Sequence, residues 1–298
     1  MSKSSEELGV NPIKKLLIKQ AVPASVGILI MSIYGIVDTI FVGRYVGSLG
    51  IAAITVVMPI TFLISSIGMA IGMGGASIIS RALGSNNEEK ALLTFGNQAT
   101  LTVVLALGIV FLGSFFQEKI LVLFGGKGNI LPYAKEYFQI ILYGIPFLAW
   151  AMMSNNVIRA EGAPKTAMLI LVVPAVVNMI LDPILIVYLD WGIAGAAWAT
   201  TFAYMASALY SLFFFFGGKS EMKLLTKNLR LKFDIVREIF SLGIVTLARQ
   251  GTVSVLFIVL NNSLFTYGNE ASIAVYGIIN RIMMFANFPV LGITQGYV

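Results

Sequence analysis

Cysteine and histidine are both absent from the 298 residues, and each absence excludes a class of chemistry. Without cysteine there are no disulfides, thiolate metal sites or cysteine nucleophiles. Without histidine there is no Ser-His-Asp triad, no HExxH zinc helix and no imidazole proton shuttle. Any ion site must therefore use oxygen ligands, which suit hard cations such as Na⁺, or carboxylates that carry protons. We expect a protein that is not an enzyme and that has no cofactor.

Charge is also scarce, at 11% of residues, while 58% are apolar and the mean hydropathy is +0.89. A soluble domain carries about 25% charged residues, so we expect an integral membrane protein. Eight apolar stretches are each long enough to cross about 30 Å of hydrocarbon as a helix. Their expected bounds are 17–43, 50–80, 91–115, 132–155, 164–189, 192–216, 236–264 and 270–298. Barrel strands alternate over about ten residues, whereas these runs are continuous, so the predicted fold is an all-α polytopic membrane protein.

The few cationic side chains lie mostly on one side of this predicted topology. Fourteen Lys and Arg residues fall in the loops of one side and four in those of the other. The positive-inside rule then puts the N-terminus in the cytoplasm, with the plasma (inner) membrane as the location. The basic segment 217–235 is interpreted as a cytoplasmic linker beside anionic lipid, so the net charge of +6 does not indicate a nucleic-acid partner.

A weak internal repeat appears when the chain is shifted by 224 residues against itself. Seven identities align the first two spans with the last two, and the basic segment lies between the copies. Parallel six-span repeats are a known transporter architecture. We therefore expect a six-helix lobe at 1–216, a linker at 217–235, and the first two helices of an incomplete second lobe at 236–298. On this hypothesis the parent protein has about 450 residues; a complete eight-helix protein is the alternative.

Acidic residues inside hydrocarbon are costly and mark functional sites, and there are two clear cases, Asp38 and Asp182. At about 1.5 Å per residue, both carboxylates lie roughly 10 Å inside the outer face, and Thr200 lies at about 13 Å. Asn178 and Tyr34 each precede one of the carboxylates by four residues and so share a helix face with it. Close carboxylates against an apolar wall allow one of them to hold a proton near neutral pH. The pattern predicts a proton or sodium pocket.

Each of these residues also has an ordinary structural explanation. Asp182 precedes Pro183 and could bond backbone amides at a proline kink, and Asp38 could lie at a frayed helix end. Thr200 could bond its own helix backbone. Arg249 and Arg281 lie within spans seven and eight, where they could face a central cavity or pair with further helices.

Several segments together resemble the MATE (multidrug and toxic compound extrusion) family, in particular its bacterial MepA-like and DinF-like branch. They are 34–43 (YGIVDTIFVG), 68–72 (GMAIG), 80–84 (SRALG), 159–165 (RAEGAPK), 178–183 (NMILDP) and 192–200 (GIAGAAWAT). The resemblance implies a MATE-like helical bundle of the MOP superfamily with two six-helix lobes, of which this chain holds the first and two helices of the second. It also implies that Asp38, Asn178, Asp182 and Thr200 form a cation-coupling cluster, and that Tyr34 and Tyr137 line the lobe.

The resemblance implies a secondary antiporter that exports amphipathic cationic compounds in exchange for H⁺ or Na⁺. Its partners would be small organic cations and the lipid bilayer, with no obligate protein partner. Two alternatives stay open at this point. One is a lipid-linked oligosaccharide flippase of the same superfamily, which usually needs a basic central cavity. The other is a non-transporting membrane scaffold, in which neutralising both aspartates would alter only stability.

Overall fold

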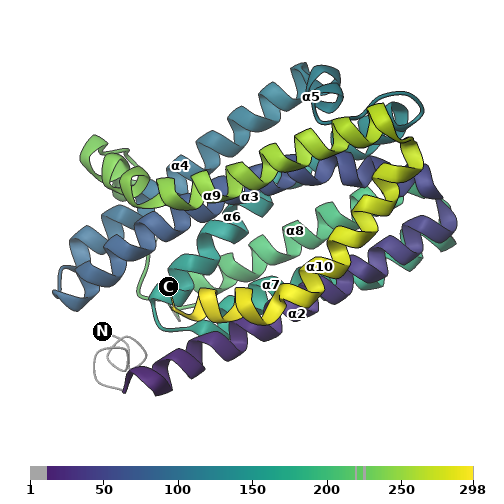
Figure 1. The fold of residues 1–298 in the computed structure, drawn as a ribbon. Helices are drawn as coiled ribbons and strands as arrows, with labels where there is room; N and C mark the ends of the chain where they lie inside the picture. Colours follow the sequence, from purple (N-terminus) through teal and green to yellow (C-terminus); the bar gives the residue numbers. More distant parts are fainter. Residues whose placement is uncertain (1–11, 219, 224–225, 298) are drawn as a thin grey trace.

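The computed structural model describes residues 12–218, 220–223 and 226–297, which form a bundle of long helices running side by side (Figure 1). No β-strand occurs within these ranges. Residues 1–11, which the expected first lobe includes, lie outside the described residues. The α-helices are α2 (Ile13–Tyr45), α3 (Ser48–Gly84), α4 (Glu88–Phe115), α5 (Gln117–Leu123), α6 (Ile130–Ala160), α7 (Pro164–Asp182), α8 (Gly192–Phe216), α9 (Phe233–Tyr267) and α10 (Glu270–Tyr297). A π-helix, η1 (Pro183–Tyr188), continues α7, and a 3₁₀ turn, η2 (Thr226–Asn228), lies before α9.

Each expected span corresponds to one long helix, so the all-α polytopic fold is confirmed. Seven helices within the described ranges are long and apolar enough to cross a membrane, counting α7 and η1 as one. The seven do not include α10, although it occupies the expected eighth span. Its crossing of the membrane therefore stays a prediction.

Short polar or glycine-containing turns end the helices where the sequence suggested breaks. At the start of α4, the Asn87 side chain accepts a hydrogen bond from the backbone N–H of Lys90 at 3.0 Å, which caps the helix. Between α6 and α7, Gly162 has φ of 78°, a left-handed conformation that glycine adopts without strain. These local signals set where the helices begin and end.

The end of α7 departs from regular helix geometry. Pro183 has no backbone N–H, so the α-helical ladder is interrupted directly after Asp182, and the chain continues as the π-helix η1. The helix type thus changes at the proline, whereas the hydrogen bond given to the Asp182 carboxylate comes from the side chain of Asn178 and not from the backbone. Asp182 itself is fully buried at this point, at 0% exposure.

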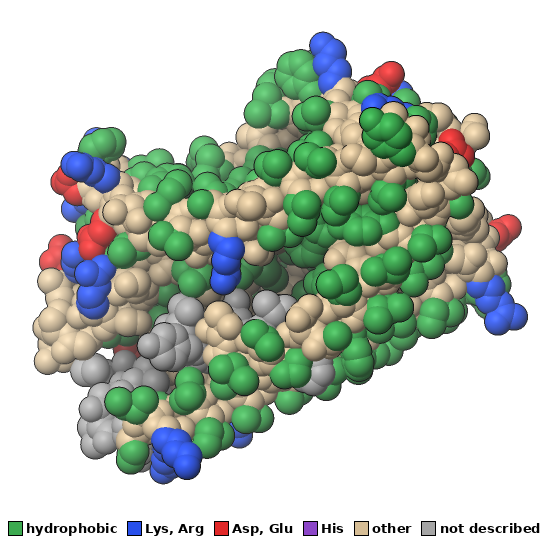
Figure 2. All heavy atoms as spheres, in the orientation of Figure 1, with side chains coloured by type: hydrophobic (Ala, Val, Ile, Leu, Met, Phe, Trp, Pro, Cys, Tyr) green, Lys and Arg blue, Asp and Glu red, His purple; other side chains and the backbone are tan. Residues whose placement is uncertain are grey.

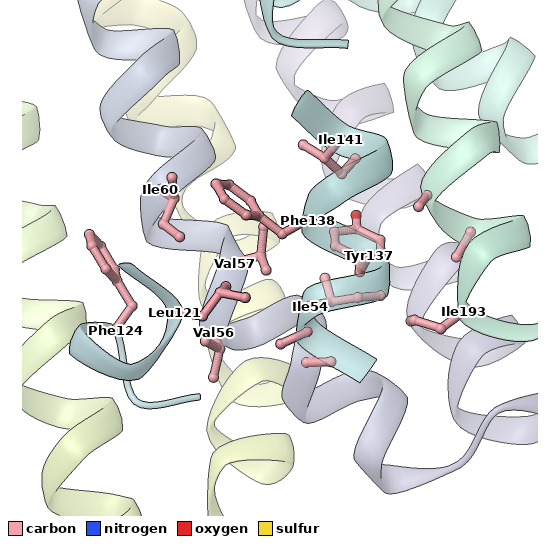
Figure 3. Close-up of a cluster of buried hydrophobic side chains, with 14 of the residues drawn as sticks. Ile54, Val56, Val57, Ile60, Leu121, Phe124, Tyr137, Phe138, Ile141 and Ile193 are labelled. Atoms are coloured by element: carbon pink, nitrogen blue, oxygen red, sulfur yellow. The ribbon is translucent and has the colours of Figure 1, made fainter. Parts of the chain in front are cut away.

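The central pair of the bundle is α3 and α6, along which the buried apolar side chains form two clusters. In the first cluster, Ile54, Val57 and Ile60 of α3 lie beside Tyr137 and Phe138 of α6 (Figure 3). The second cluster continues toward the opposite ends of the same two helices. These two helices therefore form a rigid core on which the remaining helices pack.

The outer surface carries many exposed apolar side chains. Phe111, Phe115 and Val245 are 62%, 72% and 72% exposed, values unusual for large side chains in water. Figure 2 shows apolar side chains over the length of one face, with most charged side chains at its two ends. This distribution is what a helical bundle in lipid requires.

The last two helices pack on the first two in crossed order, α9 on α3 and α10 on α2 (Figure 1). Glycines permit the close approach of α9: a Cβ at Gly74 would overlap the carbonyl of Ile239, and one at Gly243 would overlap the carbonyl of Ala70. A two-fold relation between the pairs α2–α3 and α9–α10 would produce this crossed order. The division into lobes stays a prediction.

The segment between α8 and α9 is tied to α4. The Asn97 side chain accepts from the backbone N–H of Lys232 at 2.7 Å and donates to the carbonyl of Arg230 at 3.4 Å. Thr100 donates to the carbonyl of Leu229 at 2.7 Å. Residues 229–232 are therefore fixed against α4 directly before α9 begins.

Candidate functional site

The first half of the site joins α6, α7 and α8 through hydrogen bonds. When the amide of Asn178 is oriented to suit both neighbours, its nitrogen donates to Asp182 Oδ2 at 2.8 Å and its oxygen accepts from the backbone N–H of Thr200 at 3.3 Å. The side chain of Tyr137 is hydrogen-bonded to that of Thr200. Four polar side chains from three helices therefore make one continuous network. All four are less than 9% exposed.

The second half of the site is centred on Asp38, a buried residue in the C-terminal half of α2. Its Oδ2 lies 3.1 Å from Nη2 of Arg281, which belongs to α10. The same guanidinium donates through Nη1 to the carbonyl of Gly35 at 2.8 Å. The side chains of Arg281 and Asp38 are 13% and 8% exposed, so this ion pair is largely removed from solvent.

The two halves interact electrostatically. The negative charge of Asp38 and the positive charge of Arg281 both act on Asp182, and all three act on Tyr34. With both carboxylates ionised, Asp38, Asp182 and Arg281 give the cluster a formal charge of −1. A buried net charge is expensive unless something balances it. The site is therefore suited to receive one further positive charge.

All six residues singled out from the sequence lie in this region. Asp182, Asn178, Thr200 and Tyr137 share the hydrogen-bonded network, while Asp38 and Tyr34 lie together on α2. Asp38 is not at a frayed helix end, because α2 continues to Tyr45. Their roles in ion coupling stay predictions.

Two further residues belong to the site, and the sequence analysis did not assign them. Arg281 was identified as an intramembrane cation, but its partner was left open; the structure shows that this partner is Asp38. Tyr204 was missed; its electrostatic contacts are with Tyr34, Tyr137 and Asp38. It lies four residues after Thr200 on α8, so helical spacing could have found it.

A third buried carboxylate lies outside the spans, in the turn between α6 and α7. Glu161 is 4% exposed, and Ser220 Oγ lies 2.8 Å and 2.9 Å from its two carboxylate oxygens and donates to the carboxylate. The backbone N–H of Glu221 donates to Oε2 at 3.1 Å. Burial nevertheless raises the pKa of Glu161 to about 7. The sequence analysis did not select this residue, since a Glu in a loop is ordinarily exposed.

Taken together, the long apolar helices and the charged cluster buried among them define a polytopic α-helical membrane protein with an intramembrane ionisable site. This is the type of site that ion-coupled membrane transporters use. The sequence profile of the MatE family matches residues 23–184, and the chain belongs to this family.

Two curated relatives are both named "Multidrug export protein MepA". The protein of Staphylococcus aureus (strain MRSA252) is 28% identical over 288 residues, which are 97% of this chain and 64% of the relative. The protein of Staphylococcus saprophyticus is 30% identical over 278 residues, 93% of this chain and 61% of the relative. The chain thus spans less than two thirds of the length of these relatives. The relatives are named as export proteins and not as enzymes. This agrees with the absence of cysteine and histidine, which excluded the catalytic sites that depend on them.

Solved structures of the same family are also similar to this chain. The MATE multidrug transporter DinF-BH, solved in complex with a bound drug, has a TM-score of 0.92 and 37% identity over 99% of this chain and 66% of its own. An outward-facing MATE transporter of the MOP superfamily has a TM-score of 0.88, with 26% identity, and covers 99% of this chain and 65% of its own. An inward-facing one has a TM-score of 0.82, with 26% identity and coverages of 92% and 63%. The MATE-like helical bundle predicted from the sequence is confirmed.

Proposed function

We propose that this protein is a secondary active antiporter that exports amphipathic cationic compounds in exchange for H⁺ or Na⁺. The observation that carries the proposal is the buried cluster in which Asp38 is paired with Arg281 and Asp182 lies within the electrostatic influence of both. A site with one uncompensated negative charge attracts an organic cation and a small coupling cation alike. The names of the relatives, which describe multidrug export, support this substrate class.

The proposed organisation follows the predicted topology. The six helices of 1–216 form one lobe, 217–235 is a cytoplasmic linker, and 236–298 begins a second lobe. The protein resides in the plasma (inner) membrane with a cytoplasmic N-terminus, because the loops on that side hold most of the cationic side chains. Its partners are small organic cations and lipid, without nucleic acid or an obligate protein partner.

The transport cycle rests on competition for one negative charge. When the site faces outward, H⁺ or Na⁺ binds at Asp38 and Asp182, neutralises the cluster and releases the organic cation. When the site faces inward, loss of the ion restores the charge and the next organic cation binds. Each ligand moves the equilibrium only as far as its affinity differs between the two states of the lobes.

The chemistry of the cluster suits either coupling ion. A proton needs only a carboxylate, which Asp38 or Asp182 provides. Sodium needs several oxygens, and the carboxylates together with Thr200 and the amide oxygen of Asn178 are of the right type. No group of three or more His, Cys, Asp or Glu side chains that could hold a metal gathers in the described ranges.

The flippase alternative is disfavoured by the charge of the site. A site for a lipid pyrophosphate needs surplus positive charge, whereas Arg281 is already paired with Asp38. With Asp182 included, the cluster repels an anionic headgroup.

Binding of tetraphenylphosphonium, a permanent lipophilic monocation, tests the proposal on the purified protein. We expect saturable binding that weakens as the pH falls or as Na⁺ is added, whichever ion is coupled. Asp38→Asn should abolish both this binding and efflux from cells, while the protein stays in the membrane. Unchanged binding and efflux by that variant would refute the proposal.

A further inference from the structure

The ion pair between Asp38 and Arg281 connects two parts of the chain that are distant in sequence. Arg281 Nη1 bonds to the carbonyl of Gly35, 246 residues away, so the guanidinium is fixed to α2 at two points. That carbonyl also accepts a hydrogen bond from Thr39 Oγ1 at 2.7 Å. The contact is therefore a specific docking of α10 on α2.

Burying an arginine among apolar helices is unfavourable unless its charge is compensated. Here the compensation comes from Asp38, the same carboxylate that the proposed function assigns to cation binding. The other ionisable side chains around the pair are Asp182 and the phenols Tyr34, Tyr137 and Tyr204. Arg281 is thus the positive charge of the cluster, and it occupies the position that an incoming cation would need.

Arg281 and Asp38 also belong to different parts of the predicted architecture. Asp38 lies on the first helix of the six-helix lobe, and Arg281 lies on a helix assigned to the second lobe. Movement of α10 away from α2 would separate the pair and leave both charges uncompensated. Occupation of Asp38 by another cation would remove the part of this penalty that falls on Asp38.

We propose that Arg281 is a tethered counter-ion for Asp38, which holds α10 against α2 while the site contains no cation and is displaced when a monovalent cation binds. Arg281 is in this sense a positioning residue that links occupancy of the site to the relative position of the lobes. The inference rests on the proposed function for the identity of the displacing cation. The attachment of α10 to α2 through Arg281 does not depend on the proposed function.

Because the chain contains no cysteine, a single introduced pair can report the contact between α10 and the N-terminal helices. The side chains of Met58 on α3 and Asn280 on α10 lie 3.9 Å apart, nitrogen to sulfur. We would replace both by cysteine in the full chain and measure the rate of cross-linking by a short bifunctional thiol reagent. The rate would be measured with and without tetraphenylphosphonium, in the wild-type background and in each variant.

The expected result has two parts. Arg281→Gln should slow cross-linking by about threefold or more, because α10 loses its charged attachment, and tetraphenylphosphonium should slow the wild-type background but not this variant. Arg281→Lys, which keeps the charge, should behave as wild type. Arg249→Gln is the matched control, because it removes the same charge from an exposed position on α9. Asp38→Asn combined with Arg281→Gln leaves neither member of the ion pair as a buried charge without its partner, and it should reproduce the slow rate even where the single variant is unstable.

The outcomes separate this inference from the proposed function. Wild-type cross-linking in both Arg281→Gln and the double variant overturns the tether, whatever the cation does. Equal slowing by tetraphenylphosphonium with and without Arg281 overturns the displacement. If loss of Arg281 slows the reaction but tetraphenylphosphonium neither binds nor changes the wild-type rate, the tether stands and the cation-export proposal fails.

Discussion

Two buried acidic sites in this protein are stabilised in different ways. Asp38 is compensated by a guanidinium carried on α10, while Glu161 is held by the hydroxyl of Ser220 and a backbone N–H. Both carboxylates are less than 9% exposed. The difference is the kind of partner, since one carries a full charge on a separate helix and the other supplies only dipoles.

The kind of partner, charged or dipolar, determines what each site can do. Burial raises the pKa of Glu161 and the two hydrogen-bond donors offset only part of this rise, so the protonated form is favoured. A charged partner balances Asp38 completely, but it can leave when another cation takes its place. The first arrangement suits a structural role beside the segment between α8 and α9, and the second suits exchange.

After Asp38→Asn, the next largest effect should come from Asp182→Asn, because it removes the negative charge that Arg281 leaves uncompensated when both carboxylates are ionised. We expect tetraphenylphosphonium affinity to fall about a hundredfold and its dependence on pH or Na⁺ to disappear. Asp190→Asn is the matched control, since Asp190 is exposed and its positive φ of 53° is tolerated by asparagine. If binding by the Asp182→Asn variant depended on pH or Na⁺ as in the wild type, Asp182 would have no part in ion coupling. Its role would then be structural, at the point where Pro183 changes the helix type.

Glu161→Gln should change stability with pH. The folded-state pKa, about 7, is above the ordinary value of 4.5, so the stabilisation is fully present below pH 4.5 and is lost as the pH rises through 7. The variant cannot ionise, so relative to wild type it should gain roughly 2–3 kcal/mol between pH 5 and pH 8. Melting temperatures in detergent at the two pH values measure this gain. Glu136→Gln, at an exposed position, should show none, and a gain of equal size there would contradict the assignment.

Ser220→Ala should have a smaller effect of the same origin. Its hydroxyl donates to Glu161, and loss of one hydrogen bond to a charged group costs about 1–2 kcal/mol. The ionised form of Glu161 loses most, so the destabilisation should be greater at pH 8 than at pH 5. The same melting series detects this. An equal loss at both pH values would show that Ser220 acts only through packing.

Thr200→Val should have the smallest effect, because it keeps the shape of the side chain and the backbone N–H that bonds to Asn178. It removes only the hydroxyl shared with Tyr137, so we expect cation affinity to fall about two- to fivefold. Thr201→Val, which removes a hydroxyl bonded to the carbonyl of Ile140, is the control and should leave affinity unchanged. A larger loss in Thr201→Val would indicate that affinity follows the packing of α8 rather than the network.

From the sequence, the candidate site could be predicted only where its residues lie on the same helix. The four-residue spacings of Asn178 with Asp182 and of Tyr34 with Asp38 place each pair on one face, and both pairs do lie at the site. Tyr204 could have been found by the same spacing from Thr200. Glu161 could not, because its burial depends on Ser220 and Glu221, which return to it from the far end of α8.

The helices, their order along the chain and the positions of the two aspartates within them follow from the sequence alone. These features depend on local hydrophobicity and on the fixed rise of the α-helix, so they need no knowledge of neighbours. Only the tertiary structure decided that α10 packs on α2 and brings Arg281 to Asp38. Helices that are apolar on every side do not specify which of their faces meets which partner. The charge balance of the site therefore became visible only when helices from the two ends of the chain were placed together.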